Sequence, residues 1–197
     1  METLNLNTIQ YKLSLNDENA LAELYHYYSK RLIQFAKSIV RTNELAEEIV
    51  EDVFIKLWRN RFSICNIKNL NVYLYIAVKN TSLNMLSQKA RQLISSPFDF
   101  LNIELENELD NPDDLMITAE MMQKMHRVID SLPPRCKMIF KLVREDGLKY
   151  KEVAEILNIS VNTIDAQIAI AVKKICTALE IKKPSKKISA SITEKEF

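Results

Sequence analysis

The chain has 197 residues, of which 47% are hydrophobic and 27% charged, and its formal net charge is +1. This composition is typical of a folded globular protein and excludes the intrinsically disordered class. The sequence contains a single glycine. Tight hairpins, Rossmann turns and phosphate-cradling loops need glycine for positive φ or for close approach to a ligand, so they are disfavoured. The composition therefore predicts an all-α fold.

The cysteines and histidines do not indicate a metal site. Cys65, Cys136 and Cys176 are odd in number and far apart, and neither His26 nor His126 has other ligand-type residues at metal spacing. We therefore expect no metal, no cofactor and no disulfide framework. The sequence also lacks the pattern of a signal peptide and any run approaching about 18 apolar residues, so we expect a cytoplasmic protein.

Acidic and basic residues are segregated along the chain. Five acids and no base lie between Glu44 and Asp52, whereas seven bases and no acid lie between Val53 and Phe98. From residue 92 to 123 there are eight acids and no lysine or arginine, and the chain closes with the lysine-rich "KKPSKKISASITEKEF". These blocks predict an acidic docking face, a basic surface that faces phosphate groups and an acidic linker. The alternative for each block is a solvated helix face or a flexible spacer.

The N-terminal half has the pattern of amphipathic helices. The segment "SLNDENALAELYHYYSKRLIQFAKSIV" begins with a capping signal, Ser14 followed by Asp17, and has apolar residues at helical spacing. Asn43 is the expected cap of a second helix in "TNELAEEIVEDVFIKLWRNR". Asn69 or Asn71 is the expected cap of a third in "NLNVYLYIAVKNTSLNMLSQKARQ".

The second of these helices carries acids away from its apolar stripe. Glu47, Glu48, Glu51 and Asp52 include neighbours at i, i+3 and i, i+4 spacing, where like charges repel by roughly a few tenths of a kcal/mol per pair. A basic partner surface would turn this cost into a gain. The pattern therefore favours a docking helix.

The third helix and the loop before it combine amines and amides with aromatic rings. Lys79, Asn80 and Asn84 have no opposing carboxylate nearby in the sequence, and Tyr73 and Tyr75 stand near the start of the helix. This mixture is typical of surfaces that bind nucleic-acid backbone and stack exposed bases. The alternative, which is favoured for any single tyrosine, is a residue of the core.

The C-terminal half contains a helix-turn-helix pattern. After the predicted helix "LMITAEMMQKMHRVIDSL", the segment "PPRCKMIFKLVREDG" starts with prolines, which a first helical turn tolerates, and ends at Gly147, a plausible C-cap. In "YKEVAEILNISVNTIDAQIAIAVKK", Asn158 suits a left-handed turn position and Ser160 suits the cap of the next helix. Ile164 and Ile168 are expected to hold that helix to the core.

Together these segments resemble the extracytoplasmic-function sigma factors, the smallest bacterial transcription initiation factors. "AEEIVEDVFIKLW" is similar to the polymerase-docking helix of that family, and "NVYLYIAVKNTSLNMLSQKAR" is similar to its promoter-melting helix. The segment "IDSLPPRCKMIFKLVREDGLKYKEVAEILNISVNTIDAQIAIAVKKI" resembles its helix-turn-helix domain. The resemblance implies two small helical domains, sigma region two at 14–93 and sigma region four at 116–181, joined by a flexible acidic linker at 94–115 and followed by a disordered basic tail at 182–197.

The resemblance also implies contacts for individual residues. The docking helix would bind the clamp helices of RNA polymerase through Glu48, Glu51, Asp52 and Ile55. Region two would bind and open the minus-ten element through Lys68, Tyr73, Lys79, Asn80, Asn84, Gln88 and Arg91. Region four would bind the polymerase flap and read the minus-thirty-five element through Lys149, Lys151, Ser160, Val161, Asn162, Thr163, Asp165, Ala166 and Gln167.

The recognition helix departs from the commonest family pattern. Many members carry Arg or Lys at the positions of Asp165, Gln167 and Ile170, and many carry Asp at the position of Asn84. Asn162 and Gln167 retain groups that read adenine edges, each good contact being worth about 1–3 kcal/mol of discrimination. We therefore expect a protein that binds core polymerase first and promoter DNA second.

The resemblance also implies the partners of the chain. "TIDAQIAIAVKK" is most similar to sigma factors of the Bacteroidetes, whose usual partner is a membrane-spanning anti-sigma protein tied to nutrient uptake. The expected partners are thus core RNA polymerase, promoter DNA and such an anti-sigma factor, with no small-molecule substrate.

Three other classes of protein were weighed against this interpretation. A conventional repressor or response-regulator output domain shares the helix-turn-helix but has no need of an acidic docking helix or an acid-free melting segment. A helical adaptor that has lost DNA binding is supported by the uncharged start of the recognition helix. An enzyme is disfavoured because there is no glycine loop, no metal spacing and no nucleophile with an evident base.

Overall fold

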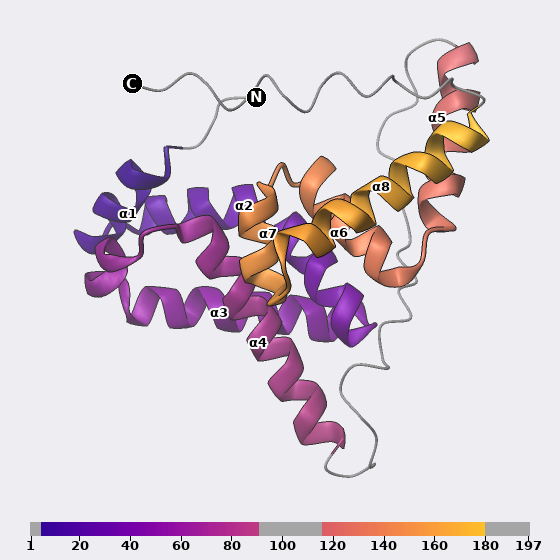
Figure 1. Cartoon of the computed structure of the whole chain (residues 1–197). Helices are drawn as coiled ribbons and strands as arrows, with labels where there is room; N and C mark the ends of the chain where they lie inside the picture. Colours follow the sequence, from indigo (N-terminus) through magenta and orange to yellow (C-terminus); the bar gives the residue numbers. More distant parts are fainter. Residues whose placement is uncertain (1–4, 91–115, 180–197) are drawn as a thin grey trace.

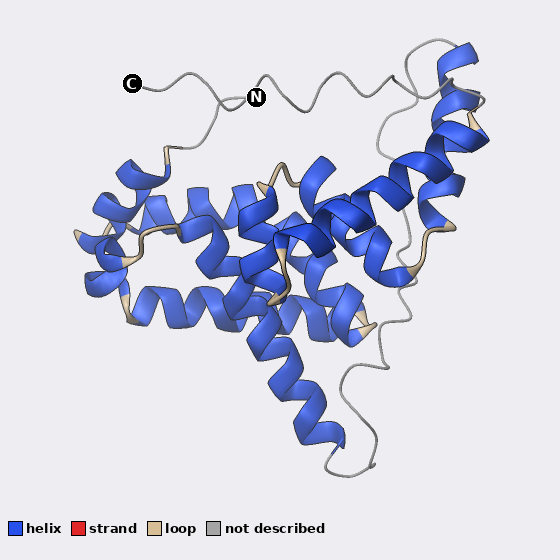
Figure 2. Ribbon diagram, in the orientation of Figure 1, coloured by secondary structure: helices blue, strands red, loops and turns tan. Residues whose placement is uncertain are grey.

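The computed structural model describes residues 5–90 and 116–179, and every secondary-structure element within these two ranges is a helix (Figure 1 and Figure 2). The predicted all-α fold is therefore confirmed. We call 5–90 the N-terminal region and 116–179 the C-terminal region. The predicted acidic linker at 94–115, the predicted basic tail at 182–197 and Arg91 lie outside the described residues.

The N-terminal region contains four α-helices and one short 3-10 helix among its described residues. These are α1 (Leu6–Ser14), α2 (Glu18–Val40), α3 (Asn43–Arg59), η1 (Arg61–Asn66) and α4 (Leu70–Ala90). Helix α1 has no counterpart in the sequence prediction, whose first helix starts at the Ser14 capping signal. Helix α1 is too short to be stable alone, and it is held in place by packing on η1, which follows about fifty residues later in the chain.

The start of α2 differs from the predicted capping signal. Asp17 is the N-cap, and its Oδ1 accepts hydrogen bonds from the backbone N–H of Asn19 at 2.9 Å and of Ala20 at 3.4 Å. Ser14 instead ends α1, and its hydroxyl donates to the backbone oxygen of Tyr11 at 2.7 Å. The expectation that Ser14 opens the helix is therefore wrong, because its backbone still belongs to the preceding helix.

Helices α3 and α4 begin close to the predicted positions. Thr42, rather than Asn43, is the N-cap of α3, and its side chain makes no cap hydrogen bond. At the start of α4, the backbone N–H of Val72 donates to Asn69 Oδ1 at 3.1 Å, so Asn69 is the cap. The predicted cap of α4 is thus confirmed, and that of α3 is wrong by one residue.

The core of the N-terminal region lies where α2 packs along α3 and α4. The buried Gln10 side chain on α1 donates from Nε2 to the backbone oxygens of Ile64 and Ile67, both at 2.9 Å. A buried carbonyl without a partner costs about 1–3 kcal/mol, so this amide fixes the path of the chain between α3 and α4. The largest fully buried side chains of this core include Tyr75, Leu13, Leu24, Leu32, Ile49, Ile64, Leu70 and Leu74.

The C-terminal region consists of α5 (Met116–Asp130), α6 (Pro134–Arg144), α7 (Tyr150–Leu157) and α8 (Val161–Ala178). Helices α5, α6 and α7 all pack against α8. Pro134 occupies the first turn of α6, where its missing N–H removes no intrahelical bond. Beyond the end of α6, Gly147 has φ +72°, and the N–H of Leu148 donates to the backbone oxygen of Leu142 at 3.0 Å. Gly147 therefore supplies the positive-φ turn after α6, but the prediction that it caps the helix is wrong, because α6 ends at Arg144 and Glu145 is its C-cap.

The helix-turn-helix forms as predicted. Asn158 has φ 54°, and Ser160 caps α8 by accepting a hydrogen bond from the N–H of Thr163 at 3.1 Å. Ile164 and Ile168 are buried and face the other helices of the C-terminal region. Each of these features depends on neighbouring residues, which is why the sequence alone predicts them.

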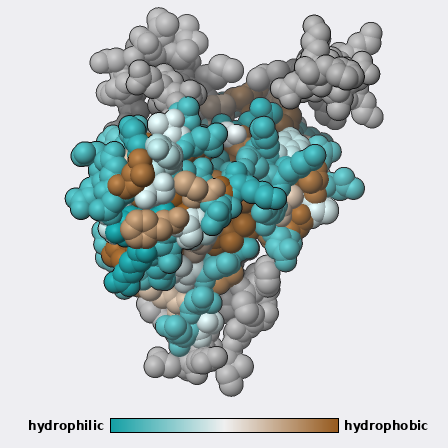
Figure 3. Space-filling model, turned by 90° about the vertical axis from the view of Figure 1, so that its left-hand side faces the viewer, coloured by the Kyte–Doolittle hydropathy of each residue, from teal (hydrophilic) through white to brown (hydrophobic). Residues whose placement is uncertain are grey.

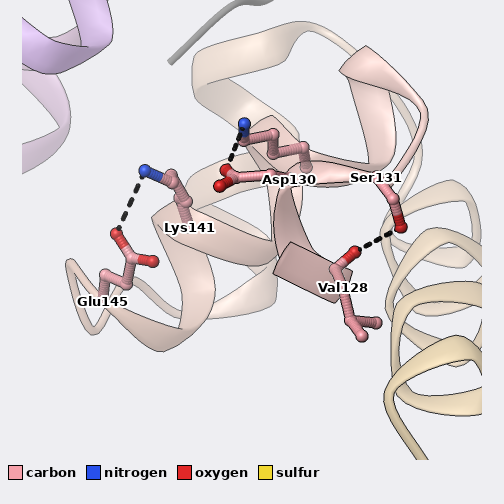
Figure 4. A network of polar contacts seen from close by, with 6 residues as sticks. Val128, Asp130, Ser131, Lys141 and Glu145 are labelled. Carbon is pink, nitrogen blue, oxygen red and sulfur yellow. Dashed lines mark hydrogen bonds and ion pairs between the residues drawn. The ribbon is translucent and has the colours of Figure 1, made fainter. Parts of the chain in front are cut away.

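A buried lysine joins α5 to α6. Lys137 is almost fully buried, and its Nζ forms an ion pair with Asp130 at 2.7 Å, while Lys141 pairs more loosely with Glu145 at 3.8 Å (Figure 4). A buried ammonium without its partner carries a large desolvation cost, so removing Asp130 alone should be more harmful than removing both charges. The pair therefore fixes how α5 meets α6.

The two regions meet where α7 packs against α4, near the middle of the view in Figure 1. The first half of α4 is enclosed by α2, α3 and α7, whereas its second half extends beyond the other helices (Figure 1). One helix thus has a buried half and a protruding half, and residues of both halves belong to the predicted DNA surface.

Candidate nucleic-acid interface

The outer face of α3 carries the predicted docking residues. Glu48 and Glu51 are exposed, Asp52 is partly exposed, and Ile55 beside them leaves 48% of its surface open to solvent. Within the described part of the chain, none of these three carboxylates forms an ion pair. The arrangement is a row of uncompensated negative charges next to an exposed apolar side chain, which suits a basic partner with an apolar contact.

The opposite face of α3 explains why these residues point outward. Ile49, Val53 and Phe54 are buried, and the ring of Phe54 meets that of Tyr25 edge-on at 5.0 Å. Burial raises the pKa of the Tyr25 hydroxyl, and the charges of Glu51 and Glu47 raise it further. Glu47 and Glu51 therefore lie close enough to Tyr25 on α2 for their charges to disfavour ionisation of its hydroxyl.

An arginine stacks between two aromatic rings just after α3. The guanidinium of Arg61 lies 4.5 Å from the ring centroids of both Trp58 and Phe62, and Arg61 also donates to the backbone oxygen of Trp58 at 2.9 Å. Phe62 is 70% exposed, and nothing in the sequence pattern around it predicts this exposure. Figure 3 looks onto the face that contains α1 and η1, where brown apolar side chains lie singly among hydrophilic ones.

The protruding half of α4 presents a stripe of amides. Asn80, Asn84 and Gln88 follow one another at i, i+4 spacing and are all exposed, so they share one face of the helix. Side-chain amides both donate and accept hydrogen bonds, as contacts to bases and backbone of an opened duplex require. The structure therefore brings three of the predicted minus-ten residues together on one open surface.

The remaining predicted minus-ten residues lie elsewhere. Lys68 is exposed in the loop before α4, and Tyr73 is half-buried in its first turn. Lys79 is partly buried, and its Nζ donates to the backbone oxygen of Ile156 on α7 at 2.7 Å. Burial accordingly lowers the pKa of Lys79. Tyr75 belongs to the core, as expected for a single tyrosine in that position.

The first turns of α8 present the predicted minus-thirty-five residues. Val161, Asn162, Asp165 and Ala166 are exposed, whereas Gln167 is partly buried. Val161 and Ala166 give this surface an apolar contribution beside the amides.

Ser160 and Thr163, two of the residues predicted to contact DNA, also form the N-terminal cap of α8. The hydroxyls of Ser160 and Thr163 lie 2.8 Å apart, so both take part in the cap. Lys149 and Lys151, at the start of α7, are exposed, and the N–H of Lys149 donates to Glu152 Oε2 at 2.8 Å. The predicted contacts therefore gather at the helix-turn-helix, with amides at its centre and two lysines at the start of α7.

The two described ranges contain no group of three His, Cys, Asp or Glu side chains placed to hold a metal ion. No helix in these ranges combines the length and apolar character that a membrane crossing requires.

Two family models match the chain, one for each region. The model described as Sigma-70 region 2 matches residues 24–92, and the model described as Sigma-70, region 4 matches residues 122–175. Together the two matches cover more than half of the chain, in the order that the family requires. The chain belongs to the extracytoplasmic-function sigma factors. This sigma factor binds core RNA polymerase and recognises and opens promoter DNA, so that transcription starts at specific promoters.

Curated relatives agree with this membership. This sigma factor is 29% identical over 175 residues to the ECF RNA polymerase sigma-E factor of Escherichia coli strain K12, across 85% of this chain and 90% of that protein. It is 25% identical over 175 residues to the protein of the same name from Haemophilus influenzae, across 85% of this chain and 91% of that protein.

Two solved structures share the fold of this sigma factor. CnrH in complex with the cytosolic domain of CnrY matches with a TM-score of 0.52 and 13% identity, over 90% of this chain and 98% of that chain. RpoE in complex with the anti-sigma factor NepR from Bartonella quintana matches with a TM-score of 0.53 and 19% identity, over 82% of this chain and 98% of that chain.

Proposed function

We propose that this sigma factor docks on the clamp helices of the polymerase through the outer face of α3. The exposed side chains of Glu48 and Glu51, with Asp52 and Ile55 beside them, support this assignment. Charge attraction would speed and orient the encounter, and Ile55 would supply the apolar contact that survives at physiological salt.

The two regions divide the promoter between them in this proposal. The stripe of Asn80, Asn84 and Gln88 on α4 contacts the opened minus-ten element, and Asn162 on α8 reads base edges of the minus-thirty-five element. Lys149 and Lys151 hold the phosphate backbone without reading sequence. The proposed domains keep their predicted bounds, 14–93 for region two and 116–181 for region four.

A membrane-spanning anti-sigma factor is the proposed regulator, with the sigma factor itself acting in the cytoplasm and without catalytic activity of its own. Support comes from the two solved neighbours, one a complex with an anti-sigma factor and the other with a cytosolic domain of its partner. Core polymerase and promoter DNA are both cytoplasmic partners, which supports the location.

The docking assignment is tested by reversing charge on α3. Glu51→Lys combined with Asp52→Lys should weaken binding to core polymerase by on the order of tenfold to a hundredfold, because two favourable charge contacts become repulsive. Thermal unfolding should change little, since the outer face of α3 is solvated. The matched control is Glu23→Lys, which reverses an exposed acid on α2 rather than on α3. Holoenzyme assembly that is unchanged in the double variant would contradict the assignment.

Promoter selection is tested by run-off transcription with core polymerase on a library of genomic fragments. The expected result is transcripts that start from a small set of promoters and require this chain. A filter-binding experiment with the isolated protein at physiological salt should show weak binding to the same promoters, because few phosphate contacts are available without the polymerase. Tight, specific binding by the free protein would contradict the requirement for holoenzyme.

A further inference from the structure

Ile170 on α8 is exposed although the packing of the helix does not require an apolar residue there. The other isoleucines of α8 face the core: Ile164 is fully buried, Ile168 is 5% exposed and Ile175 is partly buried. Ile170 instead leaves 43% of its surface open to solvent. A single exposed apolar residue is ordinary on a protein surface, so the role of Ile170 depends on the side chains around it.

The residues that share the face of Ile170 are uncharged. Asn162, Ala166 and Ile170 follow one another at i, i+4 spacing and are all exposed, and the exposed Ala169 lies beside them. We call Ala166, Ala169 and Ile170 the outer patch. Asp165 is the one charged residue in the first three turns of α8, so no lysine or arginine reaches outward from this part of the helix. The face therefore offers an amide followed by an apolar surface.

Lysines follow the outer patch along α8. Lys173 and Lys174 are exposed in the turn after Ile170, and Lys149 and Lys151 are exposed at the start of α7. In DNA the phosphates lie along the edges of a groove, whereas the base edges form its floor. Uncharged side chains accompanied by lysines therefore match the major groove, since the amines can bind phosphates while the outer patch meets the bases. A purely apolar partner surface would leave these amines without an opposite charge.

Thymine is the base whose chemistry fits an apolar side chain. Its edge in the major groove carries the 5-methyl group, whereas the edges of adenine, guanine and cytosine present ring nitrogens, carbonyl oxygens or amino groups. An apolar side chain placed against those groups removes water from them without supplying a hydrogen bond, which is unfavourable. Against thymine the same side chain buries a methyl group, which is favourable.

We propose that Ile170, with Ala166 one turn before it, selects thymine in the minus-thirty-five element through contact with the 5-methyl group. This selection rests on the proposed reading of that element by α8. Residues four apart are about 6 Å apart along a helix axis, against about 3.4 Å for one base-pair step. When α8 lies along the groove, Ala166 and Ile170 therefore meet base pairs about two steps apart, and Asn162 reads a further base pair through hydrogen bonds.

Deoxyuridine tests the contact because it differs from thymine only in lacking the methyl group. Holoenzyme containing this chain is bound to a promoter found by run-off transcription, and each thymine of the minus-thirty-five element is replaced in turn, on either strand. At one or two positions the substitution should lower the affinity by about threefold to fivefold, the effect of exposing one methyl group. Deoxyuridine between the two promoter elements is the control and should leave the affinity unchanged. Equal affinities at every thymine of the element would overturn the proposal, as would an element without thymine.

A variant of the helix assigns the effect to its residue. Ile170→Ala should reduce the preference for thymine over deoxyuridine at one position to less than about twofold, and thermal unfolding should change little because the side chain is half exposed. Leu15→Ala, which shortens a 63% exposed side chain at the end of α1, is the matched control and should keep the full preference. An undiminished preference in the Ile170 variant would remove this residue from base selection.

Failure of the proposed function gives a different result from failure of the methyl contact. If α8 does not read the minus-thirty-five element, scrambling the whole element leaves the affinity of the holoenzyme unchanged. If scrambling lowers the affinity but thymine and deoxyuridine bind equally, the element is read without the methyl contact. Weaker assembly of the Ile170→Ala variant with core polymerase, at an unchanged preference for thymine, would mean that the outer patch binds protein and would also overturn the proposal.

Discussion

The two regions present their proposed DNA contacts in different ways. At the start of α8, Asn162 and Asp165 are exposed and nothing in the described chain covers them. On α4, by contrast, Lys79 is held by α7 while Asn80 and Asn84 protrude. The C-terminal contacts are available in the free protein, but part of the N-terminal set is not. Which side chains of a helix are free to contact DNA therefore depends on the elements packed against that helix as much as on its sequence.

The regions also differ in how they use charge. In the N-terminal region, Glu48 and Glu51 lie on an exposed face without an opposite charge. Their mutual repulsion destabilises the free chain slightly, and a basic partner surface would offset it. The C-terminal region pairs its buried Lys137 with Asp130 and offers mostly amides and hydroxyls at its recognition helix. In our proposal, the first region therefore supplies most of the affinity for the polymerase, and the second region reads bases weakly until the polymerase holds it near DNA.

The largest expected effect is a loss of stability on the buried face of α3, which distinguishes residues needed for folding from residues proposed to dock on the polymerase. Ile49→Ala removes a fully buried side chain and should lower the free energy of unfolding by about 2–5 kcal/mol. Ile55→Ala, six residues later, should lower it by less than about 0.5 kcal/mol because that side chain is half exposed. Urea unfolding followed by circular dichroism measures both, and competition for core polymerase should show weaker binding for the folded Ile55 variant. If the two variants lost the same free energy of unfolding, the assignment of Ile55 to an exposed outer face of α3 would be contradicted.

The next effect is a pH dependence of stability at the contact between the two regions. Burial raises the pKa of Asp146 to about 6 and the charge of Glu145 raises it further, whereas the hydrogen bond from Tyr75 and the charges of Arg31 and Lys141 lower it. Because that pKa is higher in the folded chain than in the unfolded chain, the contribution of Asp146 to stability is fully present below about pH 4 and is lost as the pH rises through 6. Lowering the pH from 7 to 5 should therefore raise the contribution of Asp146 to the free energy of unfolding by roughly 1 kcal/mol, which urea unfolding at the two pH values would measure.

The control for this pH dependence is Asp146→Asn. The amide oxygen can still accept from Tyr75, but it does not titrate, so the free energy of unfolding of the variant should change less between pH 7 and 5. The same pH response in both proteins would show that another group is responsible.

A smaller effect compares the caps of the two regions. Ser160→Ala removes the oxygen that accepts from Thr163 N–H and should destabilise the C-terminal region by about 1 kcal/mol. Thr42→Ala removes a cap residue whose side chain makes no such bond, so it should cost much less. Thermal unfolding of the two variants gives the comparison, and a larger loss for Thr42→Ala would contradict it.

The smallest effect concerns the acid on the recognition helix. Asp165 is exposed near the start of α8, where a carboxylate opposes DNA phosphates but also favours the positive end of the helix. Asp165→Asn should raise holoenzyme affinity for its promoter by about twofold to fivefold and change unfolding by less than about 0.5 kcal/mol. Asp130→Asn is no suitable control because it breaks the Lys137 pair, so Glu155→Gln, an exposed acid on α7, serves instead. Weaker promoter binding by Asp165→Asn would indicate that the carboxylate accepts a hydrogen bond from a base.

Features that depend on a few neighbouring residues were predictable from the sequence. The left-handed Asn158, the Ser160 cap and the turn at Gly147 each follow from local backbone preferences. The Ser14 and Asn43 caps are wrong by one to three residues, because several polar residues compete and the end of the preceding helix decides among them. Helix α1 is missing from the prediction because its partner, η1, lies far along the chain.

The outward faces of α3 and α8 were also predictable. The apolar stripe of each helix fixes which face is buried, so Glu51 and Asn162 could be assigned to the opposite face from periodicity alone. The sequence favoured a core position for Tyr75, but the contacts of Tyr75 with Asp146 and of Lys79 with Ile156 were not predictable. They join α4 to residues on or just before α7, more than seventy positions away in the chain.

By itself, the sequence determined the helices from α2 onward, the caps at Asn69 and Ser160, the acidic outer face of α3 and the order of the two sigma regions. These are consequences of local propensity, apolar periodicity and charge order, which need no knowledge of distant neighbours. Only the tertiary structure decided that Lys79 closes the end of α7, that Tyr75 reaches Asp146, and that half of α4 is covered. Those contacts join separate elements, and their geometry depends on how two cores pack together, which no short stretch of sequence encodes.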